Sequence, residues 1–195
     1  MARPRTFNES EVLERAVALF RSRGFERASM PELTAQLGIC RQSLYNAFGD
    51  KRGLYLAALD LYGSQEIDAK LAQLASAPSP LQGIQALVTS WGAYGSQCPS
   101  EGCLTITAIV DSTDDEEARR LVEGHVDRLE KGIRAALKKA QAAGELTPAA
   151  DPTRLARSLV TTCYGVGVLA KLPGSSPRVK AAVAEALDRL ESLRP

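Results

Sequence analysis

The chain has 195 residues, of which 45% are hydrophobic and 24% are charged. This length and composition exclude a disordered chain, and they allow a folded core that needs neither disulfides nor a structural metal. Its 24 Lys and Arg residues nearly balance its 23 Asp and Glu residues, and the net charge of +1 argues against a protein that coats nucleic acid through bulk charge.

No stretch of the sequence approaches the roughly 18 consecutive apolar residues that a membrane span needs. The basic N-terminus leads into polar residues at 8–11 instead of an apolar segment, so we expect no signal peptide and a cytoplasmic protein. The four cysteines form no C-x-x-C pair, and His125 is the only histidine. We therefore expect reduced thiols, no metal site and no bound cofactor.

Strand signals are nearly absent and helix formers dominate, so the sequence predicts an all-α protein of about nine helices. Caps and glycines mark the ends of the first four, which we expect at residues 8–23, 30–37, 41–48 and 51–74. After a break rich in Ser and Pro, five more are expected at about 80–96, 102–113, 115–143, 152–171 and 176–193.

Residues 29–51 combine two short helices with a turn that contains Gly, which is the helix-turn-helix arrangement. Within the second helix of this pair, Leu44 and Phe48 are four residues apart and share an apolar face. The opposite face gathers side chains that can donate hydrogen bonds, namely Arg41, Gln42, Ser43, Tyr45 and Asn46. Arg and Gln or Asn pair bidentately with guanine and adenine in the major groove of DNA, so we expect this face to bind DNA.

The order L-G-I-C-R-Q-S-L-Y-N-A-F-G-D-K, after F-R-S-R-G-F at the end of the first helix, resembles the DNA-binding domain of the TetR (tetracycline-repressor-like) family. The resemblance is close over residues 5–60, and the remainder agrees in length and helix count. It implies that Ser29 caps its helix at the phosphate backbone and that Tyr45 and Lys51 contact phosphates. Arg3 and Arg5 precede the first helix, as the basic arms of many members do.

Two positions depart from the family pattern. Cys40 stands where Ser or Thr is common, which weakens the cap of the second short helix. Ala47 stands where His is common, which removes a frequent phosphate contact. Neither change removes the polar face that would read the DNA.

The charge divides unevenly along the chain. Residues 1–53 carry nine basic and six acidic side chains, whereas residues 54–195 carry fifteen basic and seventeen acidic ones. We therefore expect residues 1–53 to form a three-helix DNA-binding domain and residues 54–195 to form a larger helical domain. The resemblance implies that this larger domain binds a ligand and forms the dimer.

The family resemblance implies a two-fold homodimer in which the last two helices pair with their mates. Such a dimer would read two half-sites of a pseudo-palindromic operator about one helical turn apart, ~34–36 Å. The apolar stripes of these helices also supply intrachain core, and the expected interface residues are Leu155, Leu159, Val166, Val183, Leu187 and Leu190.

Residues 80–143 resemble the ligand-binding core of the family, which implies a small-molecule effector whose identity the sequence does not give. Apolar side chains at helical spacing are more often plain core than a pocket. The expected lining residues are Trp91, Tyr94, Cys98, Cys103, Ile106, Ile109, Leu129, Ile133 and Tyr164.

Cys103 stands at the expected start of a helix, where the helix dipole favours a thiolate. Residues 102–104, with Lys171 near the end of a later helix, are similar to a branch of the family that includes thiol-based sensors of electrophiles and oxidants. The hypothesis is that Cys103 senses, with Cys98 as resolving thiol and Lys171 as partner of the thiolate. The competing interpretation is that Cys103 packs as a small hydrophobic residue.

The function we expect is a transcriptional repressor that a small molecule or thiol modification releases from its operator, and not an enzyme. One alternative is a thiol-dependent helical enzyme that uses Cys103, which would need a general base nearby. Another is a regulator whose helix-turn-helix contacts protein instead of DNA.

Overall fold

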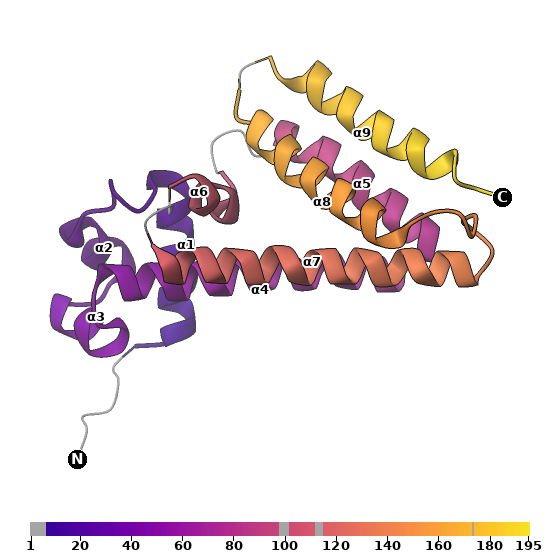
Figure 1. Ribbon diagram of the computed structural model, residues 1–195. Helices are drawn as coiled ribbons and strands as arrows, with labels where there is room; N and C mark the ends of the chain where they lie inside the picture. The colour runs from indigo at the N-terminus through magenta and orange to yellow at the C-terminus, as the bar shows by residue number, and fades with distance from the viewer. Residues whose placement is uncertain (1–6, 98–101, 112–114, 173) are drawn as a thin grey trace. The chain divides into compact units, whose positions relative to one another are not determined.

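The computed structural model describes residues 7–97, 102–111, 115–172 and 174–195, with side chains described as far as residue 93 in the first range (Figure 1). Within these residues all regular structure is helical, which confirms the all-α prediction and each expected helix. Among the described residues no helix combines the length and apolar character needed to cross a membrane. The helices are α1 (Glu9–Arg23), α2 (Met30–Leu37), α3 (Arg41–Phe48), α4 (Lys51–Ser76), α5 (Pro80–Gln97), α6 (Leu104–Asp111), α7 (Glu116–Ala142), α8 (Pro152–Leu169) and α9 (Ser176–Glu191).

The chain divides into two compact units. Unit 1 comprises residues 1–65 and 100–122, and unit 2 comprises residues 66–99 and 123–195. The division falls within α4 and not after residue 53, because the first turns of α4 bury Leu54 and Tyr55 in unit 1. The functional boundary at residue 53 stays a prediction.

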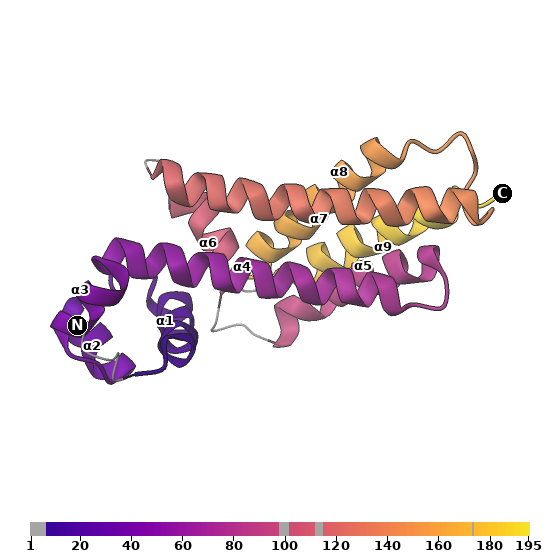
Figure 2. The same ribbon diagram turned by 90° about the horizontal axis from the view of Figure 1, so that it is seen from below.

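Three aromatic rings pack together in unit 1. Phe20 of α1 meets Tyr55 of α4 edge-on, with ring centroids 5.2 Å apart and planes at 82°. Phe25, just after α1, lies 4.9 Å from Tyr55. Edge-to-face pairs stabilise a core beyond the area that they bury. These contacts anchor α1 to the start of α4, and Figure 2 shows α1, α2 and α3 gathered at that end of α4.

In unit 2, α5 packs against α8 and α9 (Figure 1). Leu81, Ile84 and Leu87 of α5 are fully buried in this core. Carboxylates cap the helices at their N-termini: Glu145 accepts the Leu81 N–H at 2.8 Å, and Asp151 accepts N–H groups in the first turn of α8. A carboxylate at a helix N-terminus accepts hydrogen bonds from free N–H groups and interacts favourably with the positive end of the helix dipole.

Candidate nucleic-acid interface

The two helices of the helix-turn-helix are joined by three residues. The Ser29 hydroxyl accepts the Glu32 N–H at 3.3 Å and caps α2, as expected. At the other end, Gly38 adopts the left-handed conformation (φ 67°, ψ 26°) and donates its N–H to the Thr34 carbonyl. Only glycine adopts this conformation at little cost, so it ends α2 and turns the chain towards α3.

Buried leucines fix α3 against the rest of unit 1. Leu33, Leu37 and Leu44 are fully buried, and Ile39 in the turn is 7% exposed. Because Leu44 lies on the inner side of α3, residues 41, 42, 45 and 46 lie on its outer side.

The outer side of α3 is a polar surface held by bonds within the helix. Arg41, Gln42, Tyr45 and Asn46 are all exposed, and Ser43 is half-buried beside them. The Arg41 Nη2 donates to the Tyr45 hydroxyl at 3.1 Å, and the Gln42 Nε2 donates to the Asn46 Oδ1 at 3.0 Å. The structure therefore brings together on one face the side chains that the sequence singled out for base contacts.

Cys40 occupies the N-cap of α3 and makes no side-chain cap hydrogen bond. Its Sγ lies 3.2 Å from the Ser43 Oγ, and this hydrogen bond is the main cause of a lowered pKa for the exposed thiol. The N-cap of α3 thus lacks the side-chain hydrogen bond that Ser or Thr supplies at such a position, and the weaker cap stays a prediction.

Lys51, at the start of α4, is held by the loop after α1. Its Nζ donates to the Glu26 carbonyl at 3.3 Å and lies 4.4 Å from the centroid of the Phe25 ring. The Gly53 N–H donates to the Asp50 carboxylate at 2.7 Å. Asp50 therefore caps α4, and the Gly53 N–H is not available to a phosphate. Arg3 and Arg5 lie outside the described residues.

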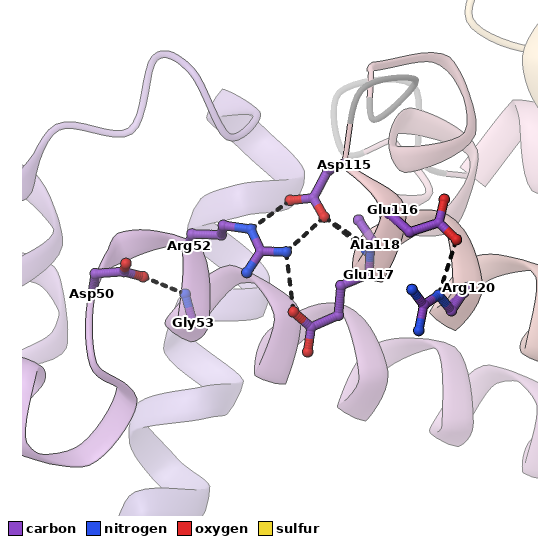
Figure 3. Close-up of polar contacts among 8 residues, drawn as sticks. All are labelled: Asp50, Arg52, Gly53, Asp115, Glu116, Glu117, Ala118 and Arg120. Atoms are coloured by element: carbon purple, nitrogen blue, oxygen red, sulfur yellow. Dashed lines mark hydrogen bonds and ion pairs between the residues drawn. The ribbon is translucent and has the colours of Figure 1, made fainter.

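Two arginines without a distinctive sequence pattern connect other segments to these helices. Arg52 of α4 binds Asp115 and Glu117 at the start of α7 (Figure 3). The Arg21 Nε of α1 donates to the Gly102 carbonyl, just before α6, at 3.1 Å. Both contacts join residues more than 60 positions apart, which no local sequence pattern reveals.

The expected ligand-pocket residues fall into two groups. Trp91, Leu129 and Ile133 are buried together in the core of unit 2, with Tyr164 packed against them. Ile106 is buried in unit 1, whereas Ile109 is exposed and the expectation for it is wrong, because α6 turns it away from the core. The Tyr94 side chain and Cys98 lie outside the described residues.

Two cavities are described, and none of these residues lines either. One of about 280 Å³ lies in unit 1 between residues 22–27, Tyr55 and α6, and one of about 340 Å³ lies in unit 2 between α4 and α7. The location of the effector pocket stays a prediction. The described residues contain no cluster of His, Cys, Asp or Glu that could hold a metal ion.

Cys103 immediately precedes α6, and its carbonyl accepts the Thr107 N–H, so it occupies the expected helix start. The thiol is half-buried and free. Lys171 follows α8, which ends at Leu169 and not at residue 171, because Pro173 disfavours helical backbone before it. Cys103 belongs to unit 1 and Lys171 to unit 2, and their pairing stays a prediction.

Most of the expected dimer-interface residues pack within a single chain. Leu159, Val166, Val183 and Leu190 are buried in the core of unit 2, and Leu155 and Leu187 pack against that core. Their apolar surface is already covered by the same chain, so they leave little area for a partner. The interface itself stays a prediction.

Family comparisons agree with this architecture. The family described as bacterial regulatory proteins, tetR family, matches residues 12–58, which contain the helix-turn-helix. The tetracyclin repressor-like C-terminal domain matches residues 80–191, more than half of the chain. The chain belongs to the TetR family. It is therefore a transcriptional regulator of the helix-turn-helix type.

Individual relatives align with most of the length of this TetR-family chain. It is 29% identical over 184 residues to YezE of Bacillus subtilis (strain 168), an uncharacterized HTH-type transcriptional regulator, covering 92% of this chain and 94% of YezE. It is 28% identical over 174 residues to the HTH-type transcriptional repressor ComR of Escherichia coli (strain K12), covering 87% and 82%. Among solved structures, the TetR family regulator CifR is 33% identical with a TM-score of 0.80, covering 95% of this chain and 98% of CifR.

Proposed function

We propose that this TetR-family regulator represses transcription by binding double-stranded operator DNA as a homodimer in the cytoplasm. The observation that carries the proposal is the exposed polar face of α3, where Arg41, Gln42, Tyr45 and Asn46 stand side by side. An α-helix fits the major groove, and a dimer doubles the number of base pairs that one short helix reads.

Each side chain of this surface has a separate role in the proposal. Arg41 and Gln42, in the first turn of α3, contact base edges, and Ser43 and Asn46 contact bases or the phosphates beside them. Tyr45 and Lys51 bind phosphates, as does Ser29 at the start of α2, and Arg3 and Arg5 extend the contact along the backbone. Phosphate contacts set the register of the protein and base contacts supply specificity.

Two relatives support operator binding and repression. The CifR structure is a cysteine-substituted variant in complex with 26-base-pair operator DNA, and ComR is named a repressor. Both align with most of this chain, including its helix-turn-helix.

The exposed side of α8 supports dimerisation. Residues at helical spacing along it are small or apolar; Val168 is 46% exposed, and Leu172, just beyond the end of the helix, is 54% exposed. A Cβ at Gly165 would meet no atom within 4 Å, so a partner helix could approach closely there. We propose that this stripe contacts its mate: Ser158, Thr161, Gly165, Val168 and Leu172.

A buried indole supports an effector site in the core of unit 2. Trp91 is 4% exposed, and its Nε1 has no hydrogen-bond partner among the described residues. A buried donor without an acceptor is costly, so an effector that places an oxygen there would be stabilised. The proposed effector is a small, mostly apolar molecule with one such acceptor.

An electrophoretic mobility shift tests DNA binding. The purified dimer, with DNA that flanks its own gene as probe, should give a discrete shifted band at nanomolar protein, and the band should weaken steeply as salt rises. A 200-fold excess of unrelated DNA should leave the band in place. Equal competition by unrelated DNA would contradict an operator-binding function.

We further propose that Cys103 is the thiol through which electrophiles release the DNA. The half-buried thiol stands beside Gly102, whose carbonyl binds Arg21 of α1, so an adduct at Cys103 displaces a contact of the DNA-binding helices. The adduct forms when the thiolate adds to an electrophilic carbon.

Treatment with N-ethylmaleimide should therefore abolish the shifted band of the wild type, and Cys103→Ser should resist it. Cys40→Ser and Cys163→Ser are matched controls, since they remove the other described thiols. Release of Cys103→Ser at the wild-type rate would assign the effect to another cysteine. If Cys40→Ser resists the reagent instead, the sensitive thiol is the one at the N-cap of α3.

A further inference from the structure

Arg52 makes a bidentate contact with a carboxylate at the start of α7 (Figure 3). Its Nε and Nη2 donate to the two carboxylate oxygens of Asp115, both at 2.8 Å, and Nη2 also lies 3.0 Å from Glu117. We call these three residues the Arg52 clamp. A planar guanidinium that binds a carboxylate through two nitrogens fixes orientation as well as distance.

Asp115 has a second role in the clamp, because it is also the N-cap of α7. Its Oδ1 accepts the N–H groups of Glu117 and Ala118, each at 3.1 Å. The hydrogen bonds from Arg52 and from Ala118 lower the pKa of Asp115 from 3.8 to about 2, so its carboxylate is charged at physiological pH. One carboxylate therefore joins the first turns of α4 and α7.

The first turn of α4 is in turn fixed to the end of α3. A Cβ at Gly53 would overlap the carbonyl oxygen of Phe48, the last residue of α3, so the two backbones touch there. Asp50, between the helices, binds the Gly53 N–H. Arg52 is flanked by Lys51 and Gly53, and any rotation of this turn must move α3 with it.

The same two helices are joined a second time within unit 2. Arg128 of α7 forms an ion pair with Asp68 of α4, and Gly132 of α7 leaves room for Leu71 of α4. Helices α4 and α7 each continue from unit 1 into unit 2, and they are joined in both. The Arg52 clamp is the junction on the side of the DNA-binding helices.

We propose that Arg52 is a positioning residue for DNA binding: clamped by Asp115 and Glu117, it sets the angle of the first turn of α4 and thereby of α3. This inference rests on the proposed DNA-binding function. The clamp is half-exposed, with side-chain exposures of 46%, 26% and 63% for Arg52, Asp115 and Glu117, so its contribution to overall stability is small. Its effect is on orientation.

A positioning role and a purely electrostatic role predict opposite changes in DNA affinity when a carboxylate of the clamp is neutralised. Asp115 and Glu117 are negative charges close to the DNA-binding helices, so neutralising one of them should strengthen binding to a polyanion. A positioning role predicts weaker binding on the same change. The sign of the effect separates the two.

The test compares Asp115→Asn, Arg52→Lys and Glu116→Gln. Asparagine at position 115 can still cap α7 but carries no charge. Lysine at position 52 keeps the positive charge but cannot bind a carboxylate through two nitrogens. Glu116 lies in the same turn and pairs with Arg119 and Arg120 of its own helix, so Glu116→Gln removes an equal charge without touching α4. Operator affinity is measured by fluorescence anisotropy, and amide hydrogen exchange of α3 and the first turn of α4 is measured without DNA.

We expect Asp115→Asn and Arg52→Lys to weaken operator binding about threefold to tenfold, and Glu116→Gln to leave it unchanged or slightly stronger. The amides of α3 should exchange faster in the first two variants only. Asp115→Asn binding as tightly as Glu116→Gln would overturn the inference. If the wild type binds no DNA, the proposed function fails. If the α3 amides exchange at the same rate in all three variants, the positioning role of Arg52 is wrong whether or not the protein binds DNA.

Discussion

Replacing Arg41 and Gln42 together with alanine is expected to weaken operator binding at least about 30-fold. Each bidentate base contact discriminates by roughly 1–3 kcal/mol, so the loss of two exceeds one order of magnitude. Binding to unrelated DNA should fall less than about threefold, because only one positive charge is removed. Both affinities are measured by fluorescence anisotropy at the same salt concentration.

A matched double variant in unit 2 tests whether the loss of affinity is specific to α3. Arg154 and Gln82 are an exposed arginine and glutamine of unit 2, and Arg154→Ala with Gln82→Ala removes the same groups away from α3. It should bind the operator like the wild type. If the α3 variant lost the same affinity for operator and for unrelated DNA, α3 would contact phosphates only and would not read bases. An unaffected α3 variant would favour a helix-turn-helix that contacts protein.

Replacing Gly53 with alanine is expected to destabilise the protein by about 1–3 kcal/mol, as forced overpacking does. The new Cβ would overlap the carbonyl oxygen of Phe48, and a backbone carbonyl cannot rotate away as a flexible side chain can. The free energy of unfolding is measured by urea denaturation. Operator affinity should fall as well, because the junction between α3 and α4 must open.

Gly124 provides the control for this prediction. It lies inside α7, and a Cβ built there meets no atom within 4 Å. Gly124→Ala should therefore stabilise the protein by up to about 1 kcal/mol through helix propensity alone. If Gly53→Ala proved as stable as Gly124→Ala, the close approach of α3 and α4 would not exist in solution.

Local sequence signals were sufficient for the helices. Ser29, Gly38 and Asp151 each mark a helix end through a hydrogen bond or a backbone conformation that involves only near neighbours. Boundaries are less predictable where a following residue decides the end. Helix α8 is expected to reach residue 171 but ends at Leu169, four residues before Pro173.

The outer face of α3 was also predictable, because residues four apart share a face whatever the tertiary structure. The burial of Leu44 then decides which face is outside. The Arg52 clamp was not predictable, since Arg52 and Asp115 are 63 positions apart and each looks like an ordinary surface charge.

The apolar stripes of α8 and α9 show a different limit of sequence patterns. An apolar residue at helical spacing indicates burial without saying whether its own chain or a partner covers it. Leu159 and Val183 turn out to pack in their own chain, whereas the exposed stripe that includes Gly165 and Val168 carried a weaker apolar signal.

Two copies of α3 are proposed to read the major groove of one operator, and methylation interference tests this most directly. Methylation of guanine N7 blocks the major-groove acceptor that an arginine such as Arg41 would contact. On the fragment that shifts, we predict interference at guanines in two half-sites whose centres lie about one helical turn apart, ~34–36 Å. Binding that is indifferent to N7 methylation, or that is blocked within a single half-site only, would contradict the account.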